Sequence, residues 1–344
     1  MHQNQQAVEA VQARASHDKP AVTSGREGTQ LSISGHINRM VMYADSGDEG
    51  RWFQADNDQP STRLRFVGST GLDEDWSART NLEVQFESNS SNDVPFNQNT
   101  TAAGNNSFTQ RNIELYFANT QLGKLSLGQG NTASDSVVEA NLSGTGVIAS
   151  SGVSALSGSL EFHRTGTHDT GSGTNIGDVF NSLNGLGSDD RLRYDTPTFA
   201  GAKLSTSWID GDEIDVALRY GRELDGTEVA LSLGYWDAGP TSQKEGYGGS
   251  LSFKLPFGTS LSGSYGEEDL EATGRDNPQF WHAKLGHDFD VTPLGTSAVS
   301  LDYIETDDQN TNGRAPATMR RRARASSPAK TANSSSASIR PHPS

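Results

Sequence analysis

Apolar and polar residues alternate along most of this chain in short runs that are typical of β-strands. Residues 76–87 (WSARTNLEVQFE) place Leu82, Val84 and Phe86 on one face and polar side chains on the other. Successive side chains of a strand point to opposite faces, so each run predicts a strand with one apolar and one polar face. Clusters of glycine, asparagine, aspartate and serine separate the runs, and no helix of ordinary length is predicted between them.

About 13 such strands are expected, followed by turns of two kinds. The predicted strands are residues 30–44, 61–69, 76–87, 111–118, 124–128, 191–196, 202–208, 215–221, 228–237, 246–255, 260–267, 279–288 and 297–305. Short turns such as residues 197–201 (PTFAG) alternate with long polar loops such as residues 88–108 and 267–278. This asymmetry favours a transmembrane barrel over a soluble sandwich, because outer-membrane barrels have short turns at one end and long loops at the other.

Composition excludes several classes of protein. No run of 18 apolar residues occurs, so a transmembrane helix is excluded, whereas a barrel strand needs only about 9–11 residues. The absence of cysteine excludes disulfides, zinc-thiolate sites and cysteine nucleophiles. The histidines are dispersed, and we expect no metal site and no cofactor.

The charge is unevenly distributed along the chain. The formal net charge is −16, yet the residues from Arg314 onward include seven basic side chains and no acid. Residues 1–313 therefore carry 20 basic and 43 acidic side chains. An acidic body of this kind argues against a nucleic-acid partner.

Four stretches resemble a known family. They are residues 32–45 (SISGHINRMVMYAD), 56–72 (DNDQPSTRLRFVGSTGL), 111–131 (RNIELYFANTQLGKLSLGQGN) and 191–208 (RLRYDTPTFAGAKLSTSW). In these stretches the chain resembles the general diffusion porins, which are trimeric 16-stranded barrels of Gram-negative outer membranes. The resemblance covers roughly residues 30–308.

The resemblance implies an all-β fold, an antiparallel transmembrane β-barrel of the 16-stranded porin type, with about 13 strands present and a long third loop folded inward. It implies a location in the cell outer membrane, contact with membrane lipid, and a homotrimer. It also implies a water-filled channel for passive diffusion of small hydrophilic solutes and ions, with no reaction catalysed. The excess of acids leads us to expect a weak preference for cations.

Two other functions stay open at this point. One is a channel selective for a sugar or an organic acid, built on the same barrel. The other is a surface adhesin or lectin made of soluble β-sandwiches, whose strands would alternate in the same way.

The alternation of side chains along each strand predicts which basic residues face the channel. Because Leu64 and Phe66 are expected to face lipid, Arg63 and Arg65 are expected to face the lumen. The predicted basic wall consists of Arg63, Arg65, Arg79, Arg191, Arg193 and Arg219. Arg111 shares its parity with apolar neighbours, so either it lies at the rim or a bulge shifts the register.

The segment between the strands at residues 124–128 and 191–196 is too long for an ordinary loop. Asp135 and Glu139 are the only acids of its first part, and one helical turn would place both on one face. The resemblance implies that these acids face the arginines across the narrowest point of the channel. The alternative is that both are solvated on an external loop. Residues 157–166 (SGSLEFHRTG) predict a further strand within the segment.

The two ends of the chain differ from this pattern. Residues 1–29 form a polar lead, helical or disordered, without the apolar region of a signal peptide. Residues 30–312 are predicted to be a porin barrel, expected to be incomplete, with its constriction loop in residues 131–189. Residues 313–344 form a basic low-complexity tail, expected to be disordered or to come from a shifted reading frame, where porins have a strand ending in an aromatic residue.

Overall fold

The structure is a computed structural model of the 344-residue chain. It describes residues 22–23, 28–97, 107–163, 171–242, 244–270, 276–292, 295–309 and 329–330. The predicted lead (residues 1–29) and tail (residues 313–344) lie almost wholly outside these ranges, so the expectations for them stay predictions. Within the described ranges, no helix has the length and apolar character needed to cross a membrane.

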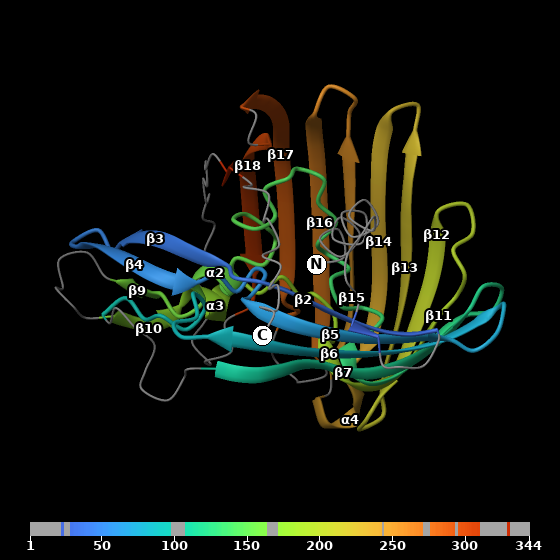
Figure 1. Cartoon of the computed structure of the whole chain (residues 1–344). Helices are drawn as coiled ribbons and strands as arrows, with labels where there is room; N and C mark the ends of the chain where they lie inside the picture. Colours follow the sequence, from blue (N-terminus) through green and yellow to red (C-terminus); the bar gives the residue numbers. More distant parts are fainter. Residues whose placement is uncertain are drawn as a thin grey trace, which may run out of the picture.

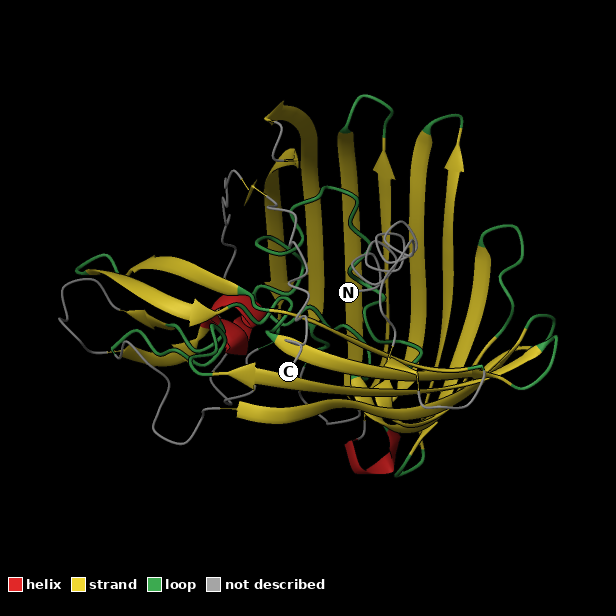
Figure 2. Cartoon of the chain, in the orientation of Figure 1, coloured by secondary structure: helices red, strands yellow, loops and turns green. Residues whose placement is uncertain are grey.

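One antiparallel sheet dominates the fold (Figures 1 and 2). Its strands are β1 Val22–Thr23, β2 Thr29–His36, β5 Arg63–Gly71, β6 Trp76–Glu87, β7 Ser107–Asn119, β8 Gly123–Asn131, β11 Ser188–Asp195, β12 Ala202–Ile209, β13 Glu213–Leu224, β14 Thr227–Asp237, β15 Lys244–Lys254, β16 Thr259–Leu270, β17 Gln279–Thr292, β18 Gly295–Asp307 and β19 Ala329–Lys330. They pair in this order, so each strand lies beside its predecessor. β1 and β19 have two residues each, which leaves thirteen longer strands of the fifteen in the sheet.

The sheet is strongly curled. In Figure 1, β2, β5, β6 and β7 run across the front of the molecule, while β12 to β18 stand upright behind them. Among the described residues, the β1–β2 edge does not pair with the β18–β19 edge, so the wall is open along one side. A single continuous curled sheet confirms the predicted barrel-type fold and is not a sandwich of two packed sheets.

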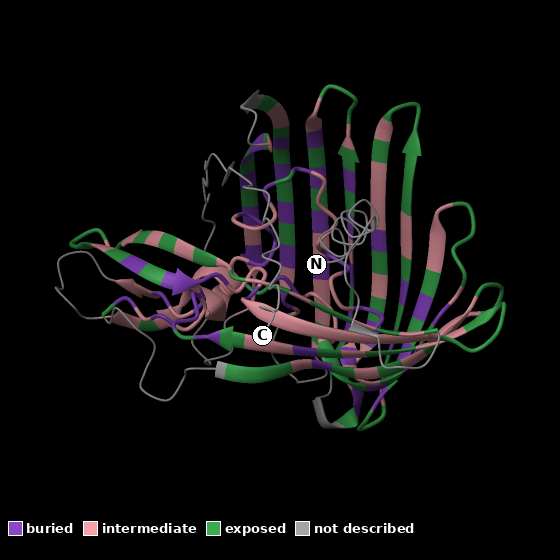
Figure 3. Ribbon diagram, in the orientation of Figure 1, coloured by how far each residue is buried: buried purple, intermediate pink, exposed green. Residues whose placement is uncertain are grey.

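The two faces of the wall differ as strand parity predicts. Bands of buried and exposed residues alternate along the strands in Figure 3. In β12, for example, Leu204 and Trp208 are exposed on the outer face, whereas Ser205 and Ser207 are buried on the inner face. An outer apolar face and an inner polar face are what a strand between lipid and an aqueous lumen requires.

Tyrosine side chains on the outer face have their hydroxyls paired near the strand ends. The Tyr247 hydroxyl donates to Glu267 Oε2 at 2.6 Å, and the Tyr303 hydroxyl donates to Glu305 Oε2 at 2.6 Å. Rings that are apolar on one side and polar at the tip suit the boundary between hydrocarbon and water.

The first predicted strand, residues 30–44, is wrong as a single element. The chain leaves the main sheet after β2, and β3 (Arg39–Asp45) pairs instead with β4 (Gly50–Asp56) in a separate hairpin. Apolar residues stand at alternate positions in β2 and form the continuous run MVMYA (residues 40–44) in β3, but this change does not show which strand β3 pairs with. The β4 strand was not predicted.

The long segment between β8 and β11 begins along the inner face of the curled sheet, and its middle part lies beside the β3–β4 hairpin, at the left of Figure 1. We call its described part, residues 132–163 and 171–187, the inner loop. Its elements are α2 Ser154–Ser157, β9 Glu161–His163, β10 Gly171–Asn175 and α3 Ile176–Val179. The strand expected within residues 157–166 is therefore confirmed as β9. One further short helix, α4 Gly239–Ser242, connects β14 to β15.

Two of three apolar clusters lie between the inner loop and the wall, and the third joins Phe53 and Ala55 of β4 to Val94, Phe96 and Leu160. Val137 and Val138 of the loop are fully buried together with Ala217 of β13 and Trp236 of β14. A second cluster joins Phe180 and Leu183 of the loop to Phe280 of β17 and Ile304 of β18. Burial of these side chains stabilises the loop against the inner face, since each large apolar side chain removed from water contributes about 1.5–3 kcal/mol.

Candidate functional site

The beginning of the inner loop is held by one buried carboxylate of the wall. Asp215 of β13 accepts the backbone N–H of Ala133 at 3.2 Å and that of Ser134 at 2.7 Å. It also accepts the Ser134 hydroxyl at 2.7 Å and the backbone N–H of Ser207 at 3.0 Å. Four donors on one buried carboxylate fix the loop to the inner face of β12 and β13, because a buried charge is tolerated where its lone pairs are satisfied.

Two arginines of the wall bind the backbone carbonyls of the same segment. Arg193 Nη1 donates to the carbonyl oxygen of Thr132 at 2.7 Å. Arg219 Nη1 and Nη2 donate to the carbonyl oxygens of Ala133 at 2.8 Å and Asp135 at 2.6 Å. Both arginines lie on the inner face, and their guanidinium groups are used to anchor the loop backbone.

Glycines on the inner face let the loop approach the wall closely. A Cβ atom added to Gly234 of β14 would lie 2.8 Å from Val137 Cγ1, and one added to Gly248 of β15 would lie 2.9 Å from Val138 Cγ1. Real Cβ atoms do not come this near to other carbons, so the two valines occupy the space that larger residues would fill.

Further along, the loop remains hydrogen-bonded to the wall. The backbone N–H of Ala140 donates to Ser250 Oγ of β15 at 2.9 Å, and Thr145 Oγ1 donates to Ser300 Oγ of β18 at 2.9 Å. Lys284 of β17 donates to the carbonyl oxygen of Ala149.

The loop then crosses to the opposite side of the molecule. Asn57 Nδ2, in the connection between β4 and β5, donates to the carbonyl oxygen of Val147 at 2.9 Å. Ser91 Oγ, just after β6, donates to the carbonyl oxygen of Ala155 at 3.0 Å. These bonds join the β13–β18 side of the wall to the β5–β6 side through the loop.

A cluster of three arginines around one carboxylate lies on the inner face of β5, β6 and β7. Glu83 Oε1 is 3.0 Å from Arg63 Nη1 and 3.1 Å from Arg111 Nε, and Arg65 Nε donates to Glu83 Oε2 at 2.6 Å. The Glu83 side chain is 1% exposed, whereas those of Arg65 and Arg111 are 20% and 24% exposed. Three cations share one anion, so the cluster keeps a formal charge of +2 with two arginines in contact with the lumen.

A bulge explains why Arg111 belongs to this cluster despite its parity. The pairing of β6 with β7 shifts between Glu83 and Val84, so that Glu83 lies opposite Asn112 and Val84 lies opposite Gln110. Arg111 is the extra residue, and its Nη1 donates to Gln85 Oε1 at 2.6 Å. Of the two explanations open for Arg111, the bulge is therefore confirmed.

The two acids of the loop lie on its anchored side. Asn131 Nδ2 donates to Asp135, and Asn184 Nδ2 donates to Glu139 Oε1 at 2.7 Å. Burial and the neighbouring Glu139 carboxylate raise the pKa of Asp135 to about 6, although Arg219 and Arg193 act in the opposite direction. Among the described residues, the charges that act on Asp135 include those of Glu139 in the loop, Arg193 of β11 and Arg219 of β13.

The structure thus places the six predicted basic residues in four different settings. Arg63 and Arg65 belong to the Glu83 cluster, whereas Arg193 and Arg219 hold the loop backbone. Arg191 is buried and pairs with Glu114 Oε2 at 2.6 Å, and Arg79 is exposed on β6.

Two residues with structural roles were missed from the sequence. Glu83 and Asp215 share the inward parity of Arg65 and Arg219, which is the signal that marks them as inward-facing. Parity alone does not show which inward side chains meet, because that depends on the register between strands.

The interior is therefore a polar surface with an anchored loop on one side and a basic cluster on the other. Within the described ranges, no group of three histidines, aspartates or glutamates is placed to hold a metal ion. An arrangement of this kind can guide charged and dipolar solutes through confined water.

Two solved structures have a similar fold. An anion-selective porin from Comamonas acidovorans is 12% identical with a TM-score of 0.50, covering 81% of this chain and 79% of that chain. OmpF of Salmonella typhi, in complex with daunomycin, is 13% identical with a TM-score of 0.51, covering 87% of this chain and 85% of that chain. No curated protein matches the chain by sequence.

At these low sequence identities, the two structures show a similar fold but do not assign the chain to a family. A family model makes that assignment. The model described as Gram-negative porin matches residues 10–323, which is most of the chain. The fold agrees with it, since the thirteen longer strands form one curled antiparallel sheet with a long loop inside. The chain belongs to the Gram-negative porin family and is an outer-membrane channel protein.

Proposed function

We propose that this porin forms a water-filled channel for passive diffusion of small hydrophilic solutes and ions, and that it catalyses no reaction. The observation that carries the proposal is the course of the inner loop, which is bound to the inner face of β13 to β18 at several points. A loop held inside the wall narrows the lumen. Among the described residues, it adds no group of catalytic side chains to the lumen.

The constriction lies between the inner loop and the Glu83 cluster. Asp135 and Glu139 supply negative charge from the anchored side of the loop, and Arg63, Arg65 and Arg79 supply the basic side, with Arg111 added by the bulge. Arg193 and Arg219 line the wall behind the loop, where they hold its backbone and set its position, and Arg191 pairs with Glu114 of β7. Opposed charges across a narrow aqueous gap orient dipolar solutes and reject apolar ones.

The channel is expected to prefer cations weakly. Residues 1–313 carry 43 acids against 20 basic side chains, so the mouths of the channel attract cations over distances of about a Debye length. The basic cluster opposes this preference and keeps it small.

Reversal potentials across planar bilayers test the selectivity. With a tenfold KCl gradient at low ionic strength, the sign of the reversal potential should indicate a preference for cations. This preference should decline as the salt concentration rises from about 0.1 to about 1 M. Strong anion selectivity at low salt would overturn the cation assignment while leaving the channel itself intact.

The Glu83 cluster supports a second candidate, a channel with selectivity for organic acids. Its surplus of two positive charges matches a carboxylate solute, which arginine binds through paired hydrogen bonds. Concentration-dependent block of the KCl current by succinate but not by glucose would favour this candidate. Equal effects of both solutes would favour general diffusion.

We also propose that the chain assembles as a homotrimer in contact with outer-membrane lipid. Light scattering of the detergent-solubilised protein gives the number of copies directly. A mass of one copy would contradict the trimer.

A further inference from the structure

A hollow with a volume of about 560 Å³ lies where the β3–β4 hairpin meets the middle of the inner loop. We call it the loop hollow. One of its walls is β3, and the facing wall consists of residues of α2, β9 and α3, which gather beside the hairpin at the left of Figure 1. Sites for small molecules usually have volumes of about 300–1,000 Å³. The loop hollow shares no residue with the Glu83 cluster or with the anchors of the inner loop.

The apolar run of β3 explains why a hollow remains here. Met40 and Met42 lie opposite Ala55 and Phe53 of β4, so the four side chains share one face of the hairpin. Phe53 and Ala55 are fully buried in the apolar cluster beneath the hairpin, whereas Met40, Met42 and Ala44 are only partly buried. The core therefore stays open under β3. Methionine side chains are flexible, so such a surface adapts to the shape of a ligand.

Aromatic rings border the loop hollow. The centroids of the Phe96 and His163 rings are 4.8 Å apart, and Tyr43 and Phe162 add two further rings to the lining. The face of an aromatic ring carries negative potential, and rings grouped around a site are the usual means of binding an organic ammonium ion. The Phe96 ring already takes part in one such contact, because the Arg51 guanidinium lies 5.4 Å from its centroid.

The charged residues of the lining are acids. Asp45, the last residue of β3, and Glu161, the first residue of β9, line the loop hollow from its two walls. The lining contains neither lysine nor arginine. Arg51, which lies outside the lining, is paired with Glu49 at 3.0 Å. A cation inside the hollow would therefore be attracted by both carboxylates, whereas an anion would be repelled.

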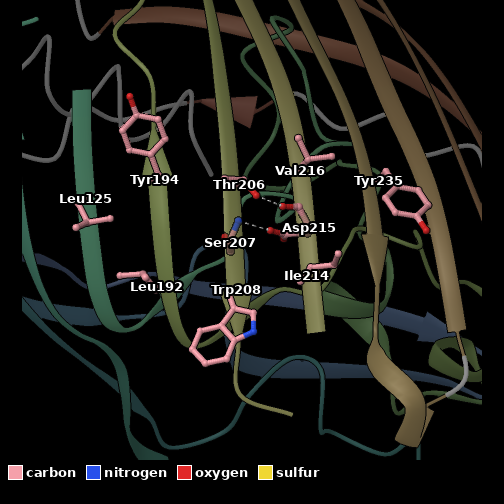
Figure 4. A pocket seen from close by; sticks show the side chains of 10 residues that line it. All are labelled: Leu125, Leu192, Tyr194, Thr206, Ser207, Trp208, Ile214, Asp215, Val216 and Tyr235. Carbon is pink, nitrogen blue, oxygen red and sulfur yellow. Dashed lines mark hydrogen bonds between the residues drawn. The ribbon is translucent and has the colours of Figure 1, made fainter. Parts of the chain in front are cut away.

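A hollow on the outer face of the wall shows the contrast (Figure 4). It has a volume of about 330 Å³, and the hydroxyls of Thr206 and Tyr235 donate to the carbonyl oxygen of Asp215 and to Glu245 Oε2, each at 2.8 Å. The one charged residue of its lining, Asp215, holds the inner loop. The loop hollow instead combines an apolar floor with rings and with two carboxylates that take no part in anchoring the loop.

We propose that the loop hollow binds a small organic cation, an ammonium ion attached to a compact apolar body. The apolar body lies against Met40, Met42 and Phe96, and the ammonium group lies between Asp45 and Glu161. Binding here does not depend on the proposed channel function, because it requires no movement of solute through the lumen.

Photoaffinity labelling with three matched probes tests the proposal. The full chain in a nonionic detergent is irradiated with a benzylamine, a benzyl alcohol or a benzoate, each carrying the same diazirine, and the labelled peptides are identified by mass spectrometry. We expect the benzylamine to label residues 40–46 and 156–163 at least about threefold more than the benzyl alcohol does, and the benzoate to label them least. An excess of benzyltrimethylammonium should lower the benzylamine labelling.

A pair of substitutions tests the role of the two carboxylates. Asp45 Oδ1 accepts the backbone N–H of Gly47 at 2.7 Å, and Glu161 accepts the backbone N–H of Gly173. An amide oxygen can accept the same bonds, so Asp45→Asn combined with Glu161→Gln removes both charges and keeps the local fold. Benzylamine labelling should then fall to the level of the benzyl alcohol.

A matched control removes the same charge elsewhere. Glu223→Gln combined with Asp225→Asn changes two exposed acids near the turn between β13 and β14 and should retain the benzylamine labelling. Ser157 of α2 also lines the hollow. Ser157→Phe should therefore block the labelling by filling the space, and Ser157→Ala should leave it unchanged.

Three results would overturn the proposal. Equal labelling of the hollow by the benzylamine and the benzyl alcohol would show that charge plays no part. Undiminished benzylamine labelling in the variant without Asp45 and Glu161 would assign the attraction to other acids. No labelling of the hollow by any probe would show that it is covered, for example by a second copy of the chain.

Discussion

Glu83 is the residue on which the basic side of the constriction depends. Three guanidinium groups, from Arg63, Arg65 and Arg111, lie within ion-pair distance of this one carboxylate. Removing one partner of a buried ionic network costs more than the network contributes, because the remaining charges are left uncompensated. Glu83 therefore sets both the stability of this part of the wall and its charge.

Glu83→Gln should raise the formal charge of the cluster from +2 to +3. We expect a loss of about 3–5 kcal/mol of stability and a shift of the reversal potential toward anions. Urea unfolding followed by tryptophan fluorescence measures the first effect, and bilayer recordings measure the second. Glu223→Gln, which changes an exposed glutamate at the end of β13, is the control and should change neither. Unaltered stability in Glu83→Gln would show that the arginines do not depend on this carboxylate.

If Asp135 lines the constriction as proposed, the channel is expected to depend on pH. Its pKa is raised to about 6, first by burial and then by Glu139. The carboxyl is therefore ionised above pH 6 and neutral below it, and cation preference should fall as the pH is lowered from 7.5 to 5. Because the pKa is higher in the folded state than in the unfolded state, protonation below pH 6 also favours the folded state.

Reversal potentials between pH 7.5 and pH 5 measure this transition. Asp135→Asn should remove it, and Glu139→Gln should move its midpoint to lower pH, because the neighbouring charge no longer opposes ionisation. Arg219 and Arg193 are present in all three proteins and lower the pKa in each. A midpoint unaffected by either substitution would assign the transition to another group.

In the proposed function, the inner loop is the element that narrows the channel. Its position depends on wall residues of several strands, of which Asp215 makes the largest number of bonds to the loop's first residues. The inner-face glycines Gly234 and Gly248 let it lie against the wall. Loop and wall therefore form one packed unit.

Asp215→Asn should loosen the beginning of the loop. An amide oxygen cannot accept all the donors that the carboxylate accepts, and each buried donor left without a partner costs about 1–3 kcal/mol. We expect larger current fluctuations in single-channel recordings than for the unsubstituted protein. Asp210→Asn, in the exposed turn between β12 and β13, should leave the recordings unchanged. Unchanged current fluctuations in Asp215→Asn would show that the other hydrogen bonds between loop and wall are enough to hold the loop.

The alternation of side chains between the two faces of a strand predicted the strands well, but it predicted the contacts between side chains poorly. Alternation gave the thirteen longer strands and the outward side chains of β12, because both follow from the two-residue period of a strand. It could not separate β2 from β3, since the change of pairing partner after β2 is a long-range contact. It could not assign Arg111 either, because a bulge shifts the parity of the residues before it, and in β7 only Phe108 marks this shift among the apolar positions.

The inner-face positions of Arg193 and Arg219 were predictable, but their pairings were not. Arg193 and Arg219 were expected on the inner wall, and their bonds to the loop backbone depend on where residues 132–135 lie in space. Long-range contacts of this kind carry no local signal. For the same reason, nothing near Glu83 in the sequence indicates that it lies beside Arg111.

The molecule as a whole is an outer-membrane wall with a polar interior and an acidic charge. Its outer face is apolar, and its inner face carries the loop anchors and the Glu83 cluster. Backbone groups at a sheet edge within hydrocarbon cost several kcal/mol each when unpaired, so the open side between the β1–β2 and β18–β19 edges must be covered in the membrane.

The central claim is that solutes pass through confined water beside the inner loop. The chain contains no cysteine, so a single cysteine introduced as Glu139→Cys reports on the loop alone. In single-channel recordings, a cationic methanethiosulfonate reagent should lower the conductance of this variant in discrete steps and leave the unsubstituted protein unchanged. Modification of the cysteine, verified by mass spectrometry, without any change in conductance would place the loop outside the conducting path and contradict the account.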